Sequence, residues 1–448
     1  MKFYSLTFSL LLTTGLLLCS QSFGEVDTTK FFLKGRTTRE TPLYTIWEPI
    51  EFVLEMDFAG QTPTEAYTIE WTCTGDDGRE RKGTAPADAP VHIQTVLDRP
   101  GFVRIRAQLL DSSGQVVRKP GLQGEFAQVF FDGGAGVDIE QIHGIPAPPD
   151  LEAFWARQKA KLEEIPLEVN YRTEVPSETE GVKIYVVSIA CPGPAPVTGF
   201  LSIPEDAAAG SLPVQVQFQG YSEARQQMMK TGPTDKIVLQ INAHGYDLVK
   251  AYEPETGEEY QRQFMAATRS NGFTYAFDPW QNSNPEKAYF NGMALRVMRA
   301  LQFVKSLPEW NGRELEVRGG SQGGLQTIWA AALDHDVTLA VADKPWCCNL
   351  AGKSCGRISY GWGIPYVKEL NYYDPVHLAS WVPATCTLKI HNAGLGDYVC
   401  PPSGVAAFYN NLRCPKEIVW VQGTTHGFWP PYTCQRFTLA APAQTTLE

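Results

Sequence analysis

A glycine-rich hexapeptide, GGSQGG at 319–324, holds Ser321 in a G-x-S-x-G pattern. Residues 314–318 before it alternate apolar and polar side chains as strands do, and residues 325–333 after it have the composition and apolar spacing of a helix. A strand, a tight turn and a helix expose the serine hydroxyl and aim backbone N–H groups at a developing oxyanion. The pattern predicts a serine hydrolase with Ser321 as nucleophile. The alternative is a glycine-rich turn with an idle serine.

A serine nucleophile needs a histidine base and an orienting carboxylate, which in this architecture follow it in the order Asp or Glu, then His. Asp397 comes just after the predicted penultimate strand, and His426 lies in the loop 423–428 after the predicted final strand. We therefore predict Asp397 as the acid and His426 as the base. The other candidates fit these places less well: His335 at the exposed end of the elbow helix, His377 on a helix, His391 within a strand, and Asp343 and Asp374 out of order.

Two backbone N–H groups are expected to form the oxyanion hole. One belongs to Gln322, directly after the nucleophile, and the second to a loop that follows an early strand. The stretch 218–221 fits this loop, because Gly220 lets the backbone turn toward the ester and leaves the N–H of Tyr221 as donor.

The surrounding elements divide into two kinds. Residues 25–131 form short alternating segments separated by turn-rich stretches, which predicts a small immunoglobulin-like β-sandwich over 25–135. The run 132–136 (DGGAG) is interpreted as a hinge. From residue 149 onward strands alternate with helices, which predicts a mostly parallel sheet with helices on both faces. The expected fold class is therefore α/β, an α/β-hydrolase fold over 136–448 preceded by the sandwich.

The first 24 residues have the apolar core and small terminal residues of a secretory signal cleaved near Gly24, so we expect export to the periplasm or the medium. Cys19 follows Leu18 where a lipoprotein signal has a small residue, so no lipid anchor is expected. No later stretch is long enough to span a membrane. The net charge of -11 argues against a nucleic-acid partner. Nine cysteines remain after cleavage, and their pairing stays open; no Cys/His spacing indicates zinc, and no metal or cofactor is expected.

From about residue 145 to the C-terminus the chain resembles the acetyl xylan esterase/cephalosporin C deacetylase family of carbohydrate esterases. The matching stretches are 149–155, 219–221, the elbow, and 397–403 with its Cys-Pro-Pro. The resemblance implies the roles already given to Ser321, Asp397, His426, Tyr221 and Gln322. The chain departs from the family pattern at Gly427, at 242–245 and in its additional β-domain.

The resemblance also implies a substrate, an acetyl or other short acyl ester of a carbohydrate such as acetylated xylan or xylo-oligosaccharides. Trp280, Trp346 and Trp429 are candidates to stack on sugar rings beside Gly220, with core or interface packing as the alternative. A homo-oligomer is left open, since compact family members form ring-like hexamers. The competing functions are a serine peptidase of the prolyl oligopeptidase type and a catalytically inert carbohydrate-binding protein.

Overall fold

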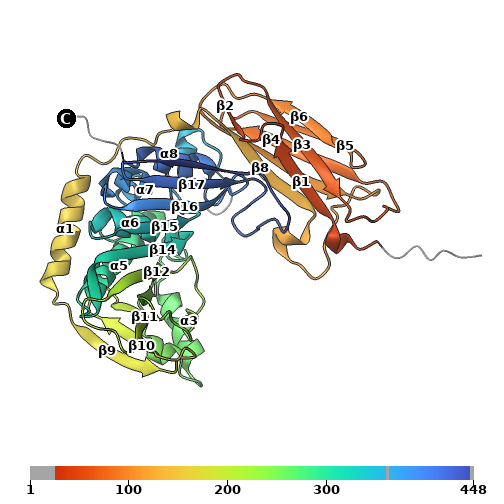
Figure 1. The fold of residues 1–448 in the computed structure, drawn as a ribbon. Helices are drawn as coiled ribbons and strands as arrows, with labels where there is room; N and C mark the ends of the chain where they lie inside the picture. Colours follow the sequence, from red (N-terminus) through yellow and green to blue (C-terminus); the bar gives the residue numbers. More distant parts are fainter. Residues whose placement is uncertain (1–25, 360–362, 444–448) are drawn as a thin grey trace, which may run out of the picture.

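The computed structural model describes residues 26–359 and 363–443, so the predicted signal sequence and Cys19 lie outside the described residues. An all-β part, red to orange in Figure 1, stands beside an α/β part that runs from yellow to blue. Within the described ranges, no helix has the length and apolar character needed to cross a bilayer.

The N-terminal part is a β-sandwich, a name used here for residues 26–137. Its three-stranded sheet has the order β1-β3-β6 and its five-stranded sheet the order β2-β8-β7-β4-β5. Alternate side chains such as Phe52 and Ile105 fill the core between the sheets. The strands are β1 Phe32–Thr37, β2 Leu43–Tyr44, β3 Ile50–Asp57, β4 Thr68–Gly75, β5 Glu80–Pro86, β6 Val91–Thr95, β7 Gly101–Leu110 and β8 Phe130–Val137.

The predicted hinge at 132–136 is wrong, because these residues belong to the buried strand β8. A Cβ on Gly133 would lie 2.1 Å from Oε1 of Gln422, and one on Gly134 would lie 2.4 Å from the carbonyl oxygen of Val103. Glycine is needed here for close approach of neighbouring chains rather than for bending. The predicted domain boundary at 135 therefore falls inside β8, which ends at Val137.

The α/β part is built on a ten-stranded sheet with the order β18-β17-β16-β15-β14-β12-β13-β11-β10-β9. The strands from β13 to β17 pair in parallel, whereas β9, β10, β11 and β18 pair antiparallel at the two ends. The bounds are β9 Val169–Val175, β10 Val182–Ile189, β11 Val197–Pro204, β12 Leu212–Phe218, β13 Ile237–Ile241, β14 Trp310–Gly320, β15 Leu339–Asp343, β16 Thr387–Gly394, β17 Lys416–Val421 and β18 Arg436–Ala441. The mostly parallel sheet is confirmed; β17, predicted as the final strand, is followed by β18.

Helices cover the two faces of this sheet unequally. On one face α1, α5, α6, α7 and α8 contact one another in a layer (Figure 1). On the other face Tyr252, which ends α2, contacts Phe200 of β11. The polar side chains of Gln240, Gln217 and Arg318 lie on this same face, on the neighbouring strands β13, β12 and β14. The helices are α1 Leu151–Glu164, α2 Leu248–Ala251, α3 Gly257–Ala267, α4 Pro279–Asn282, α5 Tyr289–Lys305, α6 Gln322–Leu333, α7 Pro375–Leu378 and α8 Pro402–Asn411.

Candidate active site

Ser321 sits at the turn between β14 and α6, as the sequence predicts. Its backbone is left-handed, with φ 56° and ψ -118°. Its N–H donates to the carbonyl of Asp343 (2.9 Å) and its carbonyl accepts from the N–H of Trp346 (3.1 Å). A Cβ on Gly323 would lie 2.3 Å from the Phe218 carbonyl, so the turn packs against β12 more closely than any side chain allows. These contacts fix a strained nucleophile position from three sides.

The structure brings Ser321, His426 and Asp397 into one hydrogen-bonded set. Nε2 of His426 lies 3.0 Å from Oγ of Ser321, and Nδ1 lies 2.9 Å from Oδ2 of Asp397. Asp397 is 1% exposed, and its Oδ1 accepts from the backbone N–H groups of Val399 (3.1 Å) and Cys400 (2.9 Å). Because a carboxylate only accepts, Nδ1 carries the proton and Nε2 is left to accept the serine proton. This geometry is suited to nucleophilic attack on an ester.

Lys344 and Cys400 both contact His426. Nζ of Lys344 donates to the carbonyl of His426 (3.1 Å), and Sγ of Cys400 lies 3.7 Å from His426 Nδ1 and donates to the carbonyl of Lys344 (3.3 Å). The donor atoms of Asp397, Cys400 and His426 lie within 4.8 Å of one another, the spacing of a metal site. Burial, however, raises the pKa of the Cys400 thiol well above its usual range. Both ring nitrogens of His426 already have partners, Asp397 and Ser321, so the arrangement fits a hydrogen-bonded set better than a metal centre.

The predicted oxyanion loop adjoins the elbow. A Cβ on Gly220 would lie 3.5 Å from the carbonyl of Gly320. The buried hydroxyl of Tyr275 donates to Oε1 of Gln322 (3.1 Å) and accepts from the N–H of Ser222 (3.1 Å). The Tyr275 ring also stacks on Tyr221 with 4.1 Å between centroids. Tyr275 thus joins the two segments that supply the predicted donors.

A buried histidine extends this network. His244 lies in the segment 242–245 that follows β13. Its Nε2 lies 2.9 Å from the Ser222 carbonyl and its Nδ1 lies 2.8 Å from the Tyr289 hydroxyl. Because a carbonyl only accepts, Nε2 carries the proton and Nδ1 accepts from Tyr289. Burial lowers the pKa of His244 to about 4, so the ring stays neutral near pH 7.

The three tryptophans differ in exposure. Trp346 is 2% exposed, with Tyr221 and Phe277 against its ring, which favours the alternative of core packing for this residue. Trp280 on α4 is 68% exposed and Trp429, three residues after His426, is 46% exposed. For these two, stacking on sugar stays a prediction.

The side chains of the rival residues are not part of this hydrogen-bonded set. Asp374 caps α7 and is buried, accepting from the N–H groups of Asn349 (2.9 Å) and Val376 (2.9 Å). Asp343 ends β15 and accepts from the Asn392 amide (3.1 Å). His335 is exposed just after α6, His377 is on α7 and His391 is within β16, as the sequence indicates.

Sequence reasoning missed Tyr275, Lys344 and the contribution of the β-sandwich. The side-chain amide of Gln422 accepts from the Gly134 N–H (2.8 Å) and donates to the Gly134 carbonyl (2.9 Å), both buried. Thr425 donates to Glu125 (3.1 Å), and a Cβ on Gly396 would lie 2.1 Å from the carbonyl of Asp132. The loops that carry Asp397 and His426 therefore rest on β8 and its neighbourhood. The position of Lys344 directly after β15 was the one signal available for it.

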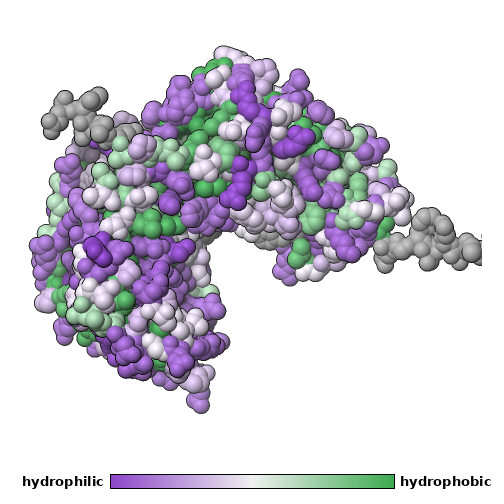
Figure 2. Space-filling view, in the orientation of Figure 1, coloured by the Kyte–Doolittle hydropathy of each residue, from purple (hydrophilic) through white to green (hydrophobic). Residues whose placement is uncertain are grey.

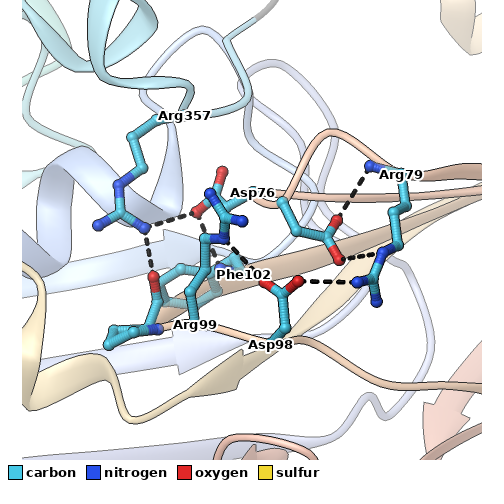
Figure 3. A network of polar contacts seen from close by, with 8 residues as sticks. Asp76, Arg79, Asp98, Arg99, Phe102 and Arg357 are labelled. Carbon is cyan, nitrogen blue, oxygen red and sulfur yellow. Dashed lines mark hydrogen bonds and ion pairs between the residues drawn. The ribbon is translucent and has the colours of Figure 1, made fainter.

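A second contact ties the sandwich to the segment 353–359 (Figure 3). Buried Asp76 accepts from the N–H groups of Phe102 (2.9 Å) and Ile358 (2.7 Å), and Arg357 lies 3.5 Å from the same carboxylate. In Figure 3, Arg79 and Arg99 both pair with Asp98 beside this contact. Burial raises the pKa of Asp76, while these N–H groups favour its ionised form.

Comparison with known proteins identifies the family. The family model described as acetyl xylan esterase matches residues 140–353 and 365–440. The chain belongs to the acetyl xylan esterase family. The match begins after the β-sandwich, and it confirms the resemblance found in the sequence.

Relatives of known identity agree with this assignment. Acetyl esterase Axe7A of Xylanibacter ruminicola is 27% identical over 286 residues, which are 60% of this chain and 61% of that protein. The chain thus spans about three fifths of the length of this curated relative. An acetyl xylan esterase from Paenibacillus sp. shares 25% identity with TM-score 0.53 over 65% of this chain and 94% of that one. Acetyl xylan esterase 1 from Thermoanaerobacterium sp. shares the fold at 18% identity and TM-score 0.52, over 65% and 93%. The α/β-hydrolase fold of the acetyl xylan esterase family is therefore confirmed.

All nine cysteines among the described residues are free thiols. The pairing that the sequence left open does not occur between them in this structure.

Proposed function

We propose that this chain is a serine esterase that removes acetyl groups from carbohydrates, with acetylated xylo-oligosaccharides as the substrate class. The observation that carries the proposal is the hydrogen-bonded set of Ser321, His426 and Asp397 at a strand–turn–helix elbow in an acetyl xylan esterase family member. Residues 136–448 form the proposed catalytic domain and residues 25–135 an accessory sandwich, with the structural boundary after Val137.

The proposed reaction has two steps. Oγ of Ser321 attacks the acetyl carbonyl carbon while Nε2 of His426 takes the serine proton, and the backbone N–H groups of Gln322 and Tyr221 hold the oxyanion. The C–O bond to the sugar breaks, and His426 returns the proton to the departing sugar oxygen. Water then attacks the acetyl-enzyme with the same proton transfers, which releases acetate and restores Ser321. Each oxyanion donor contributes about 10²–10³ in turnover.

The surroundings of the elbow support a short acyl group and a sugar alcohol. The backbone of Trp346 binds that of Ser321, and the ring of Trp346 packs with Tyr221 and Phe277 into an aromatic wall. Such a wall favours an acetyl group over long acyl chains. Trp280 and Trp429 offer exposed ring faces on which sugars stack.

Export is part of the proposal. The apolar leader over 1–24 directs the chain out of the cytoplasm, with cleavage near Gly24. N-terminal sequencing of the mature protein tests it, and a chain recovered with Met1 intact contradicts it.

The central experiment compares the mature chain with Ser321→Ala on acetylated xylo-oligosaccharides, with acetate release as the measurement. We expect acetate from the wild type and a loss of at least about 10³-fold in Ser321→Ala. Acetate release that survives the substitution contradicts Ser321 as nucleophile. If acetate is released from p-nitrophenyl acetate but not from the oligosaccharide, the serine esterase activity is supported and the carbohydrate substrate is contradicted. Cleavage of peptides but not esters favours a peptidase.

A further inference from the structure

A groove of about 600 Å³ lies where the β-sandwich meets the α/β part. In Figure 2 the molecular surface is hollowed between these two parts. The floor of the groove is the outer face of the five-stranded sheet, with Glu70 and Thr72 of β4, Lys82 of β5 and Gln108 of β7. Ile69 and Cys73 alternate with these β4 residues and point into the sandwich core. Segment 353–359 forms one wall, held to the sandwich through Asp76.

The groove adjoins both loops of the proposed catalytic set. Glu125 lines it and binds the hydroxyl of Thr425, the residue before His426. Asp132 lines it, and the Asp132 carbonyl packs against Gly396, the residue before Asp397. The Phe130 ring lies 5.0 Å from that of Phe428. The groove therefore lies against the same sandwich residues that support the loops of Asp397 and His426.

The side chains of the groove suit the hydroxyl groups of a neutral sugar. Hydroxyls both donate and accept hydrogen bonds, and the lining offers acceptors and donors together. Its four carboxylates, two glutamine amides, three hydroxyls and six basic groups belong to Glu70, Glu80, Glu125 and Asp132; Gln108 and Gln128; Thr72, Thr74 and Ser359; and Arg79, Lys82, Arg104, Arg106, Lys353 and Arg357. The carboxylates interrupt the basic groups, so the lining lacks the continuous positive surface that nucleic acid binds, and an apolar peptide would meet a polar floor. The volume lies within the range of about 300–1,000 Å³ in which small ligands are bound.

We propose that this groove binds the main chain of the glycan whose acetyl group lies at Ser321, so that the β-sandwich is an extended binding site for a neutral polymeric carbohydrate. The inference rests on the proposed function and adds a substrate preference to it: longer acetylated oligosaccharides are better substrates than short ones.

The test compares kcat/KM for acetate release from acetylated xylo-octaose with kcat/KM for p-nitrophenyl acetate, which is too small to reach the groove. Thr72→Trp fills the floor at a half-buried strand position that accepts aromatic side chains. We expect it to lower the ratio of the two values about tenfold, the size of one or two lost hydrogen bonds. Thr68→Trp, on the same strand and face but outside the groove, is the matched control and should leave the ratio as in the wild type.

A binding measurement makes the test independent of turnover and of the folding of one variant. Unacetylated xylo-octaose is titrated into Ser321→Ala by calorimetry, with and without Thr72→Trp or, as a second variant, Lys353→Ala on the opposite wall. Weaker binding in either double variant than in Ser321→Ala supports the groove even if xylan esters are not hydrolysed. A ratio and an affinity that both stay unchanged overturn it.

Discussion

At the scale of single residues, left-handed backbone gathers around Ser321. Lys344 (φ 45°), Cys347 (φ 63°) and Asn392 (φ 57°) have a positive φ, as Ser321 (φ 56°) does. Each such residue costs about 1–3 kcal/mol, which only a surrounding structure with many contacts sustains. Lys344 and Asn392 lie at the carboxyl ends of β15 and β16, beside Asp343. The strain is therefore concentrated where the proposed nucleophile and base are held.

Tyr275→Phe tests the link between the two oxyanion segments. The variant keeps the ring on Tyr221 but removes the hydroxyl that joins Gln322 to Ser222. A net loss of about 1 kcal/mol from removing this hydroxyl corresponds to about fivefold in rate, so we expect kcat to fall about fivefold with KM within about twofold. Tyr260→Phe is the control, because its hydroxyl also accepts a backbone N–H, that of Asp247, but from α3. A Tyr275→Phe enzyme with wild-type kcat contradicts the positioning role.

The lowered pKa of buried His244 predicts that the folded chain loses stability in acid. Its pKa is about 4 in the folded chain against an ordinary value of 6.5, so between these values the unfolded chain binds the proton and the folded chain does not. Stability from this group is therefore lost as the pH falls from 6.5 toward 4. Between pH 7 and pH 5 we expect the free energy of unfolding to fall about 2 kcal/mol more in the wild type than in His244→Gln.

Urea unfolding at both pH values provides the measurement. Burial raises the pKa of Asp132 and that of Asp374 to about 6, so these groups act in the opposite direction, but equally in both chains. An identical pH dependence in wild type and variant rules out the role of His244.

At the scale of elements, a substitution at Gln422, directly after β17, tests the contact between this segment and β8. Gln422→Leu has nearly the same volume but leaves both backbone groups of Gly134 buried without this partner. We expect a loss of about 2–4 kcal/mol in unfolding free energy, because each buried unpaired group costs about 1–3 kcal/mol. A lower kcat should accompany it, since His426 follows four residues later. The measurements are urea unfolding and kcat on p-nitrophenyl acetate.

Gln435→Leu is the matched control for this substitution. Gln435 also joins the C-terminal segment to the sandwich, through Thr37 and Arg39, but near the surface. Its replacement should cost less than that of Gln422 and leave kcat unchanged. Equal effects of the two substitutions would show that the contact with β8 does not position the base.

The elements most visible in the sequence were those with a strong local pattern. Alternation at 314–318 and helical spacing at 325–333 predicted β14 and α6, and the glycines between them marked the elbow. The same local reasoning failed at β8, because its glycines serve contacts with residues far away in sequence. The strands β9 and β18 lie at the ends of the sheet and are largely exposed, and they were not predicted although their sequences, VNYRTEV and RFTLAA, alternate.

At the scale of the whole molecule, sequence order predicted which residues meet but not what holds them. Asp397 and His426 were found because parallel strands bring their carboxyl ends to one edge of the sheet. Tyr275 lies in a loop without periodic pattern, and its bond to Gln322 spans 47 positions. The bond between Gln422 and Gly134 spans 288 positions, and nothing local to either residue indicates it.

That separation has a consequence for biosynthesis. During translation β8 is made long before the loops that bear Asp397 and His426, and N-terminal domains generally fold first. The last residues of the proposed catalytic set to be synthesised then close onto a surface that already exists. Turnover consequently reports that the sandwich has folded, and a nascent chain acquires its activity only after the loop that bears His426 has been synthesised.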